Sequence, residues 1–298
     1  MTGELARAYL DDEVIERGWE RAGRVIEAGL AIEASEPDRG RALARMVRML
    51  GERGLLDLFA APVSWRAICL ARERLGHASP LLELAFTMQG LGSYAITAFG
   101  NDDQRARWLP PILRGEHVAA FALTEPEAGS DLGGIATTAR REGDAYLLDG
   151  TKVFISNAGV ADVYTVFAAT APPGHERRLS AFVVAASAPG LRATPTAILG
   201  GHPIGRVQLS GVRVPTRDRL GEEGDGMRAA LGTLHRFRTT VGAAAVGFAQ
   251  RALDESVRHV RTRVQFGRPL AEQQAVQMAL ADMACEVEAA RQLVYRAA

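Results

Sequence analysis

The most informative run of the chain extends over residues 121–131 and has the sequence FALTEPEAGSD. Its first half has the apolar character of a strand, and its second half is a glycine-containing loop rich in hydroxyl groups and backbone donors. Such a loop can hydrogen-bond the polar edge of a flat heterocycle while the strand supplies an apolar wall. The same composition suits a capped turn in which Ser130 or Asp131 starts the next segment. Composition alone favours the turn.

Three later segments accompany this run in a fixed order. They are Phe154-Ile155-Ser156-Asn157, RTRVQFGRP at residues 261–269, and QAVQMALADMACEVEAARQLVYRAA at residues 274–298. Together with the first run, they resemble the flavin-binding segments and the bundle helix of the acyl-CoA dehydrogenase family. The resemblance extends over essentially the whole chain. It implies FAD as the cofactor and the α,β-dehydrogenation of an acyl thioester as the reaction.

The resemblance also implies roles for individual residues. Thr124 would hydrogen-bond the pyrimidine edge of the flavin, and Ser156 would reach its N5 and O4 side. Phe154, where the family usually has tryptophan, would flank the isoalloxazine with its aromatic face. Arg263 would contact the dinucleotide pyrophosphate, typically of a neighbouring subunit, because a planar and permanently charged guanidinium suits a diphosphate. The complete implied cofactor set is Phe121, Leu123, Thr124, Gly129, Ser130, Phe154, Ile155, Ser156, Arg263, Phe266 and Gln274.

Substrate contacts are implied at Ser130, His235 and Arg238. Ser130 would touch the pantetheine arm of the thioester, and Arg238 matches a recurrent arginine of the family. An arginine on a largely apolar helix needs a partner, so Arg238 is either a pocket residue or a member of a structural ion pair. His235 replaces the usual aspartate of the family. His202 is expected to be a surface residue and not a base.

The catalytic base is the point at which the sequence departs from its family. The reaction needs a carboxylate that takes the α proton while the β hydrogen leaves as hydride to the flavin. Most members have this glutamate in a part of the bundle beyond residue 298, and a minority have it at the position of Phe237, which cannot accept a proton. Asp254 and Glu255 lie several helical turns away. The catalytic residue therefore stays unknown.

Several explanations of the missing base are open. The favoured one is that the chain belongs to a longer gene product whose base lies outside this sequence. A naturally short subunit completed by a partner chain is the second. A non-catalytic relative that keeps the fold is the third, although the intact flavin segments count against it. A flavin-dependent oxygenase of the same fold would also tolerate loss of the glutamate.

Composition restricts the partners. The 35 basic and 35 acidic residues cancel, which argues against nucleic acid or an anionic membrane as the default partner. Arginine supplies 34 of the basic residues and Lys152 is the only lysine, a bias typical of a GC-rich bacterial genome. The resemblance adds an acyl-CoA or acyl-carrier-protein thioester as substrate and an electron-transfer flavoprotein or similar electron acceptor. It also implies a homodimer or homotetramer, with a hetero-oligomer as the alternative.

The sequence further predicts a cytoplasmic protein without a metal site. Residues 1–10 lack the features of a signal peptide, and Leu84–Gly100 is too short and too polar to span a bilayer. Cys69 and Cys285 have no metal-binding or redox spacing, which favours a reduced compartment.

Hydrophobic periodicity divides the chain into three parts. It predicts a multidomain α and β protein with an N-terminal all-α domain (1–116), a central β-barrel or sandwich domain (117–216) and a C-terminal helical bundle (217–298) that is truncated. In the central part, Asp149-Gly150 predicts a hairpin with a type I′ turn. In the first part, the Pro110-Pro111 pair predicts an interruption of a helix over 102–113.

Overall fold

The computed structural model describes residues 11–298, so the predicted absence of a signal peptide lies outside the described residues. These residues form two compact units that do not follow chain order. Unit 1 comprises the described residues up to Leu30, Ser64–Glu83 and Arg236–Ala298, and unit 2 comprises Ala31–Val63 and Leu84–His235. The predicted domain boundaries at 116/117 and 216/217 stay a prediction.

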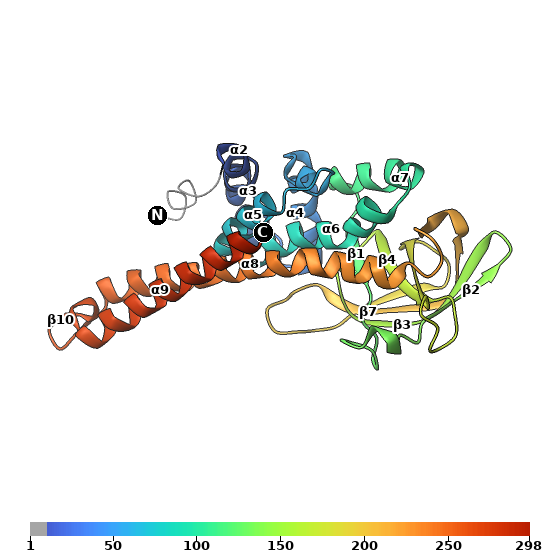
Figure 1. Ribbon diagram of the computed structural model, residues 1–298. Helices are drawn as coiled ribbons and strands as arrows, with labels where there is room; N and C mark the ends of the chain where they lie inside the picture. The colour runs from blue at the N-terminus through green and yellow to red at the C-terminus, as the bar shows by residue number, and fades with distance from the viewer. Residues whose placement is uncertain (1–10) are drawn as a thin grey trace. The chain divides into compact units, whose positions relative to one another are not determined.

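Helices occupy both ends of the chain and strands its centre, as predicted (Figure 1). The helices are α2 (Asp12–Ile15), α3 (Arg21–Ser35), α4 (Arg39–Glu52), α5 (Trp65–Ala78), α6 (Pro80–Phe99), α7 (Asp102–Leu113), α8 (Gly226–Thr262) and α9 (Gln274–Ala297). Helix α7 continues through Pro110 and Pro111, so the predicted interruption is wrong. Its first turn is fixed by a capping box between Asn101 and Gln104.

An eight-stranded mixed sheet forms the centre of unit 2. Its strands are β1 (Ala119–Ala122), β2 (Thr138–Glu142), β3 (Ala145–Ser156), β4 (Val163–Ala169), β5 (Leu179–Ala185), β6 (Leu191–Pro195), β7 (Ile204–Pro215) and β8 (Arg219–Leu220). Their order is β6-β7-β3-β2-β4-β5-β8, and β1 pairs in parallel with β4. The long pair β3–β7 therefore stands near one edge of the sheet. Strand β1 shares one edge of β4 with β2, because β5 occupies the opposite edge of β4 along its whole length.

The predicted hairpin turn at Asp149-Gly150 is wrong. Strand β3 runs through these residues and stays paired with β7, with a register shift between Leu148 and Gly150. A Cβ atom at Gly150 would stand 2.3 Å from Oγ1 of Thr137, the residue just before β2, so glycine permits a close approach of the two segments here. The tight turn between β2 and β3 is instead at Gly143-Asp144, where Gly143 has φ +62°.

Each unit has its own core. In unit 2, α4 buries one apolar stripe completely, formed by Leu43, Met46, Val47 and Leu50. Unit 1 buries Ile15, Cys69, Leu70, Ala243 and Tyr295 together. Alongside them, the Glu73 carboxylate accepts hydrogen bonds from Arg291 and from the Tyr295 hydroxyl. Because Glu73 stands on α5 and the other two on α9, this buried network fixes α9 to α5.

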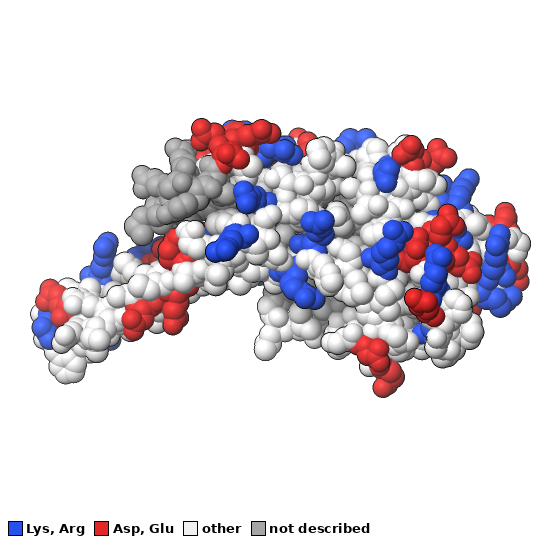
Figure 2. Space-filling view, in the orientation of Figure 1, with Lys and Arg blue, Asp and Glu red and all other residues white. Residues whose placement is uncertain are grey.

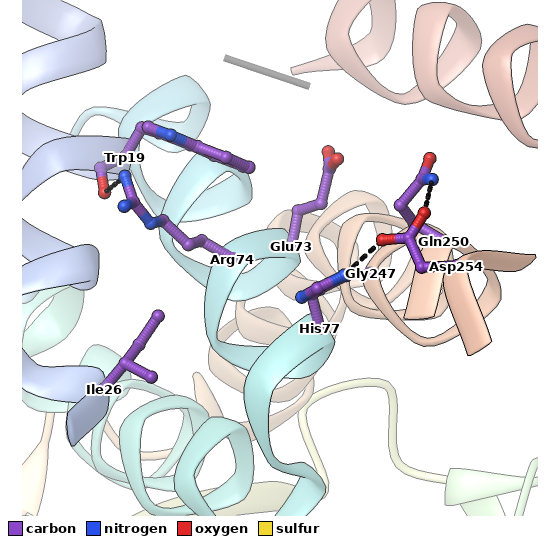
Figure 3. A pocket seen from close by; sticks show the side chains of 8 residues that line it. All are labelled: Trp19, Ile26, Glu73, Arg74, His77, Gly247, Gln250 and Asp254. Carbon is purple, nitrogen blue, oxygen red and sulfur yellow. Dashed lines mark hydrogen bonds and ion pairs between the residues drawn. The ribbon is translucent and has the colours of Figure 1, made fainter. Parts of the chain in front are cut away.

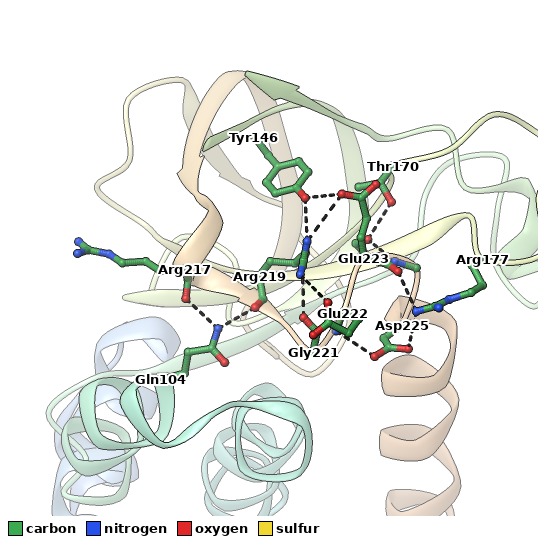
Figure 4. A network of polar contacts seen from close by, with 12 residues as sticks. Gln104, Tyr146, Thr170, Arg177, Arg217, Arg219, Gly221, Glu222, Glu223 and Asp225 are labelled. Carbon is green, nitrogen blue, oxygen red and sulfur yellow. Dashed lines mark hydrogen bonds and ion pairs between the residues drawn. The ribbon is translucent and has the colours of Figure 1, made fainter. Parts of the chain in front are cut away.

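A polar network joins α7 to the strands and to the start of α8 within unit 2 (Figure 4). The Gln104 amide donates to the carbonyls of Arg217 and Arg219 at 2.8 and 2.7 Å. The Arg219 guanidinium donates to the Tyr146 hydroxyl at 3.0 Å. Asp225, just before α8, accepts from the Glu222 backbone N–H at 3.0 Å, which fixes the loop that starts this helix.

Charged side chains of both signs are interspersed on the face shown in Figure 2. Among residues 11–298, no helix is long and apolar enough to cross a membrane. Within the same range, no group of three or more His, Cys, Asp or Glu residues could hold a metal ion.

Candidate functional site

Two of the segments singled out in the sequence lie side by side in unit 2. The loop that leaves β1 passes the middle of β3, where the Val153 N–H donates to the Thr124 carbonyl at 2.9 Å. The Lys152 ammonium donates to the Leu123 carbonyl at 3.0 Å. These contacts place Thr124 next to the segment that begins at Phe154.

A buried ion pair holds the two segments together. Lys152 is fully buried, and its Nζ atom donates to Oε1 of Glu125 at 2.7 Å. Glu125 also accepts from the backbone N–H groups of Ala136 and Thr137 at 2.6 and 3.0 Å. The loop is thereby tied to β3 on one side and to the segment before β2 on the other.

The environment acts differently on the two members of this pair. Burial lowers the pKa of Lys152 to about 8, and the Glu125 carboxylate only partly opposes this effect. For Glu125, burial favours the neutral acid, but the Lys152 ammonium and the bonds from Thr137 and Ala136 outweigh it, so the pKa lies below its ordinary value. Glu125 is therefore ionised at neutral pH.

A bulge in β3 presents Phe154 to solvent. The register with β7 shifts between Lys152 and Ile155, so β3 carries one extra residue at this point. Phe154 has φ +56°, and its side chain is 68% exposed although Val153 and Ile155 are buried. A left-handed phenylalanine costs roughly 1 kcal/mol. The bulge thus directs an aromatic ring outward from the sheet at a cost in stability.

Hydroxyl-bearing residues stand on both of the paired segments. Thr124 is half-buried in the adjacent loop, and Ser130 is exposed further along it. Ser156 ends β3, and its hydroxyl is hydrogen-bonded to Nε2 of His202 at 3.0 Å. Gly129 has open space where a side chain would stand. The two segments therefore carry an aromatic face, three hydroxyls and room beside the loop backbone.

The remaining predicted cofactor residues of unit 2 are structural in their side chains. Leu123 and Ile155 are buried, so they can offer a ligand only their backbone groups. The ring of Phe121 packs against that of Phe167, with centroids 4.9 Å apart. The side chains of these three residues therefore support the segments that carry Thr124 and Phe154 and do not offer polar groups to a ligand.

The predicted residues Arg263, Phe266 and Gln274 belong to unit 1. They stand at the turn between α8 and α9, where β9 (Val264–Gln265) and β10 (Arg268–Pro269) form a short hairpin. All three are exposed, and Phe266 is 92% exposed with φ +52°. A permanently charged guanidinium and a bare aromatic ring are thus presented on one short turn.

Helix α8 carries two of the three predicted thioester contacts. His235 and Arg238 are both exposed, and Arg238 makes no ion pair within residues 11–298. The structural ion pair that sequence reasoning left open for Arg238 is therefore not found in the described part of the chain. Phe237 is buried and meets the ring of Trp65 edge-on at 5.4 Å. Asp254 is bonded to His77, and Glu255 to Arg251, so neither is free to act as a base.

A separate cavity of about 290 Å³ lies within unit 1 (Figure 3). Its polar lining is already satisfied: His77 Nε2 and Asp254 are 2.8 Å apart, and Gln250 donates to Asp254 at 2.9 Å. Arg74 donates to the Trp19 carbonyl at 2.9 Å. This cavity belongs to the packing of α5 against α8 and offers no catalytic group.

Two features of the site were missed by sequence reasoning. The buried Lys152–Glu125 pair has a visible signal, because Lys152 is the only lysine beside 34 arginines and Glu125 lies inside the first motif. His202 was expected at the surface, but the structure places it half-buried against Ser156. Its contact depends on the path of the loop between β6 and β7, which no local pattern predicts.

The exposed surface of unit 2 fits a flavin. An isoalloxazine has an apolar face, which Phe154 can flank, and a polar edge of nitrogen and oxygen atoms, which hydroxyls and backbone N–H groups can bond. The donor set on this surface is neutral and contains no metal ligand. Fold and site together define a helix–sheet–helix protein with a platform for a flat heterocycle.

Comparisons with known proteins give the family. Models of the N-terminal, middle and C-terminal domains of acyl-CoA dehydrogenase match residues 4–116, 120–212 and 224–298. An acyl-CoA dehydrogenase of Bacillus subtilis (strain 168) is 36% identical over 264 residues, which are 85% of this chain and 70% of that protein. The chain belongs to the acyl-CoA dehydrogenase family.

Solved structures agree with this assignment. Butyryl-CoA dehydrogenase from Megasphaera elsdenii has a TM-score of 0.88 at 31% identity, covering 96% of this chain and 79% of that one. An acyl-CoA dehydrogenase from Bacillus anthracis complexed with FAD has a TM-score of 0.88 at 30% identity, and the match covers 97% of this chain and 51% of that one. A structure described for the electron transferring flavoprotein of Acidaminococcus fermentans has a TM-score of 0.86 at 32% identity, and the match covers 96% of this chain and 78% of that one.

These matches confirm the predicted family and fold class. They also confirm the predicted reaction class, since the homologues are acyl-CoA dehydrogenases, oxidoreductases that act on CH–CH groups with FAD. The match spans 54% to 75% of the length of eight curated relatives. The activity, substrates and partners of the whole protein are therefore matters for proposal.

Proposed function

We propose that this chain binds FAD and takes part in the α,β-dehydrogenation of an acyl thioester. The observation that carries the proposal is the surface around Phe154, where a bulged aromatic ring stands beside the hydroxyls of Thr124 and Ser156. When bound, FAD supplies the hydride acceptor of the reaction. The residues of the chain bind FAD and position it.

Each residue of the platform has a distinct task in this proposal. Thr124 bonds the pyrimidine edge, and Ser156 bonds the N5 and O4 side. Phe154 covers one end of the ring system, which excludes water from it. Ser130 contacts the pantetheine arm of the thioester from the exposed part of the loop. The Lys152–Glu125 pair keeps these groups in register before any ligand arrives.

The hairpin between α8 and α9 is proposed to serve a cofactor bound by a neighbouring subunit. Arg263 would bond the pyrophosphate, with Phe266 and Gln274 beside it. Their exposure in unit 1 supports this role, because a guanidinium and a phenyl ring gain by covering a dinucleotide. The proposal includes a homodimer or homotetramer in the cytoplasm, and an electron-transfer flavoprotein or similar protein as electron acceptor.

The thioester pocket is proposed to include His235 and Arg238 on α8. An exposed arginine without an ion pair in the described residues can bond a carbonyl or a phosphate of the substrate. Phe237 adds an apolar wall and cannot act as the base. No residue of this chain is proposed as the base. Coenzyme A and the phosphopantetheine of a carrier protein are both compatible with these groups.

The first experiment is the visible absorption spectrum of the purified chain with and without added FAD. Bound oxidised flavin supports the proposal, and a chain that binds no FAD even at high concentration would overturn it. The double variant Thr124→Val/Ser156→Val should weaken flavin retention. Thr138→Val/Ser210→Val is the matched control, since both residues are exposed on strands of the same sheet. Equal retention in the two double variants would remove Thr124 and Ser156 from the site.

A second experiment tests the substrate contacts. Arg238→Ala should weaken binding of an acyl-CoA without lowering the melting temperature, because no ion pair in the described residues is lost. A drop in melting temperature with unchanged binding would instead make Arg238 structural.

A further inference from the structure

His202 contacts a residue of the proposed flavin platform from a different part of the chain. It lies in the loop between β6 and β7, and its Nε2 atom is 3.0 Å from the Ser156 hydroxyl oxygen. The two residues are 46 positions apart, so the contact is made by the fold.

The loop that carries His202 is anchored beside Ser156 directly after His202. Ser156 is paired with Ile204 at the end of the β3–β7 ladder. The Asn157 N–H donates to the Pro203 carbonyl at 2.8 Å. Before His202, Gly200 and Gly201 have φ values of +88° and +66°, which let the chain turn back toward the strand. The backbone next to the imidazole is thereby held beside Ser156 by the contacts of Pro203 and Ile204.

The surroundings of His202 favour an uncharged imidazole. It lines a cavity of about 730 Å³ together with Asp38, Arg39 and Arg41 at the start of α4. Burial lowers the pKa of His202 from its ordinary value, so the ring is neutral at neutral pH. A neutral imidazole has one N–H donor and one nitrogen acceptor.

This pairing decides what the Ser156 hydroxyl can offer. A free serine hydroxyl rotates among three positions. When Nε2–H of His202 donates to the hydroxyl oxygen, the hydrogen of the hydroxyl is left to donate elsewhere. The N5 and O4 atoms of an oxidised flavin are acceptors, so that tautomer matches the proposed flavin contact.

We propose that His202 is a positioning residue, which orients the Ser156 hydroxyl so that it donates to the N5 and O4 side of the flavin. This inference rests on the proposed function. It adds to the site a residue that touches neither flavin nor thioester.

The test compares His202→Leu with His202→Gln, each in the wild-type and the Ser156→Ala background. The readouts are the midpoint potential and visible spectrum of the bound flavin and its dissociation constant. His202→Leu should shift the potential and the spectrum. It should also raise the dissociation constant about two- to tenfold, the range of one lost hydrogen bond. His202→Gln should restore most of the wild-type behaviour, because its amide N–H can donate to Ser156. In the Ser156→Ala background, both substitutions should have no further effect.

The outcomes separate this inference from the proposed function. If Ser156→Ala changes the potential or the spectrum but His202→Leu does not, His202 is not a positioning residue. If His202→Leu shifts the flavin equally with and without Ser156, it acts by another route and the inference is wrong. If Ser156→Ala leaves a bound flavin unaltered, Ser156 is outside the site and the inference falls, while FAD binding by the chain still stands. If no variant and no wild-type chain binds FAD, the proposed function itself fails.

Discussion

Two phenylalanines of this chain share an unusual backbone conformation. Phe154 has φ +56° and is 68% exposed, and Phe266 has φ +52° and is 92% exposed. A left-handed residue with a large side chain is strained, and an exposed apolar ring gains nothing from burial. Both residues lie in segments that resemble cofactor contacts, so their conformation and exposure support the proposal that both rings contact a ligand.

The support behind the two rings is very different. Phe154 stands on a bulge of an eight-stranded sheet, two residues after a buried lysine that is paired with Glu125. Phe266 stands on the turn of a hairpin whose strands have two residues each, followed by Gly267 at φ +78°. The first ring is pre-organised by its own unit. The second depends on a hairpin of two-residue strands between two long helices.

The largest effect in this comparison is expected from Lys152→Met. The substitution leaves the Glu125 carboxylate buried without its ammonium partner, and breaking a buried pair from one side costs about 3 kcal/mol. Urea unfolding should show this loss as a lower midpoint. The double variant Lys152→Met/Glu125→Gln should recover part of it. A loss below about 1 kcal/mol would mean that the bonds from Ala136 and Thr137 alone hold Glu125.

The next effect concerns the rings themselves. Phe154→Ala should weaken flavin binding about tenfold, close to 1.4 kcal/mol, because the aromatic cover of the platform is lost. Phe154→Trp should keep the affinity. Phe266→Ala should leave flavin binding unchanged in a monomeric preparation and weaken it only in an oligomer. Titration of the apoprotein with FAD, with the oligomeric state checked in parallel, measures both. Equal losses in a monomer would contradict the difference between the two regions.

The pH dependence of stability gives a smaller effect with a definite sign. The pKa of Lys152 is about 8 in the folded chain and 10.5 ordinarily, so unfolding between these values takes up a proton. Stability contributed by this residue therefore rises as pH increases through this window. Relative to Lys152→Met/Glu125→Gln, the wild type should gain about 1 kcal/mol or more between pH 8 and pH 10. Urea unfolding of both proteins, measured at steps of half a pH unit, tests this difference in stability. If the stability of the wild type relative to the double variant instead fell as pH rises, the pair would be held by charge alone.

Sequence reasoning was sufficient for the family, for the fold class and for the order of helical and strand-rich parts. It predicted two motif segments that the structure brings together at Thr124 and Val153, but the roles of their residues toward a cofactor stay predictions. It failed where tertiary contact overrides a local signal. Asp149-Gly150 has the composition of a turn, but glycine is needed there for contact with Thr137. The bulge at Phe154 and the approach of His202 depend on pairing with β7, which is distant in sequence.

The smallest effect tests whether the Phe266 turn is strained without structural benefit. Asn tolerates the left-handed region better than phenylalanine, so Phe266→Asn should raise the stability by about 0.5 kcal/mol or leave it unchanged. Phe154→Asn relieves the same φ but also removes the ring from a sheet position next to buried Val153 and Ile155, so it should bring no gain. Urea unfolding of both variants in the absence of flavin makes the comparison. A clear loss of stability in Phe266→Asn would mean that the Phe266 ring packs in the free protein. The hairpin would then be pre-organised, as the β3 bulge is.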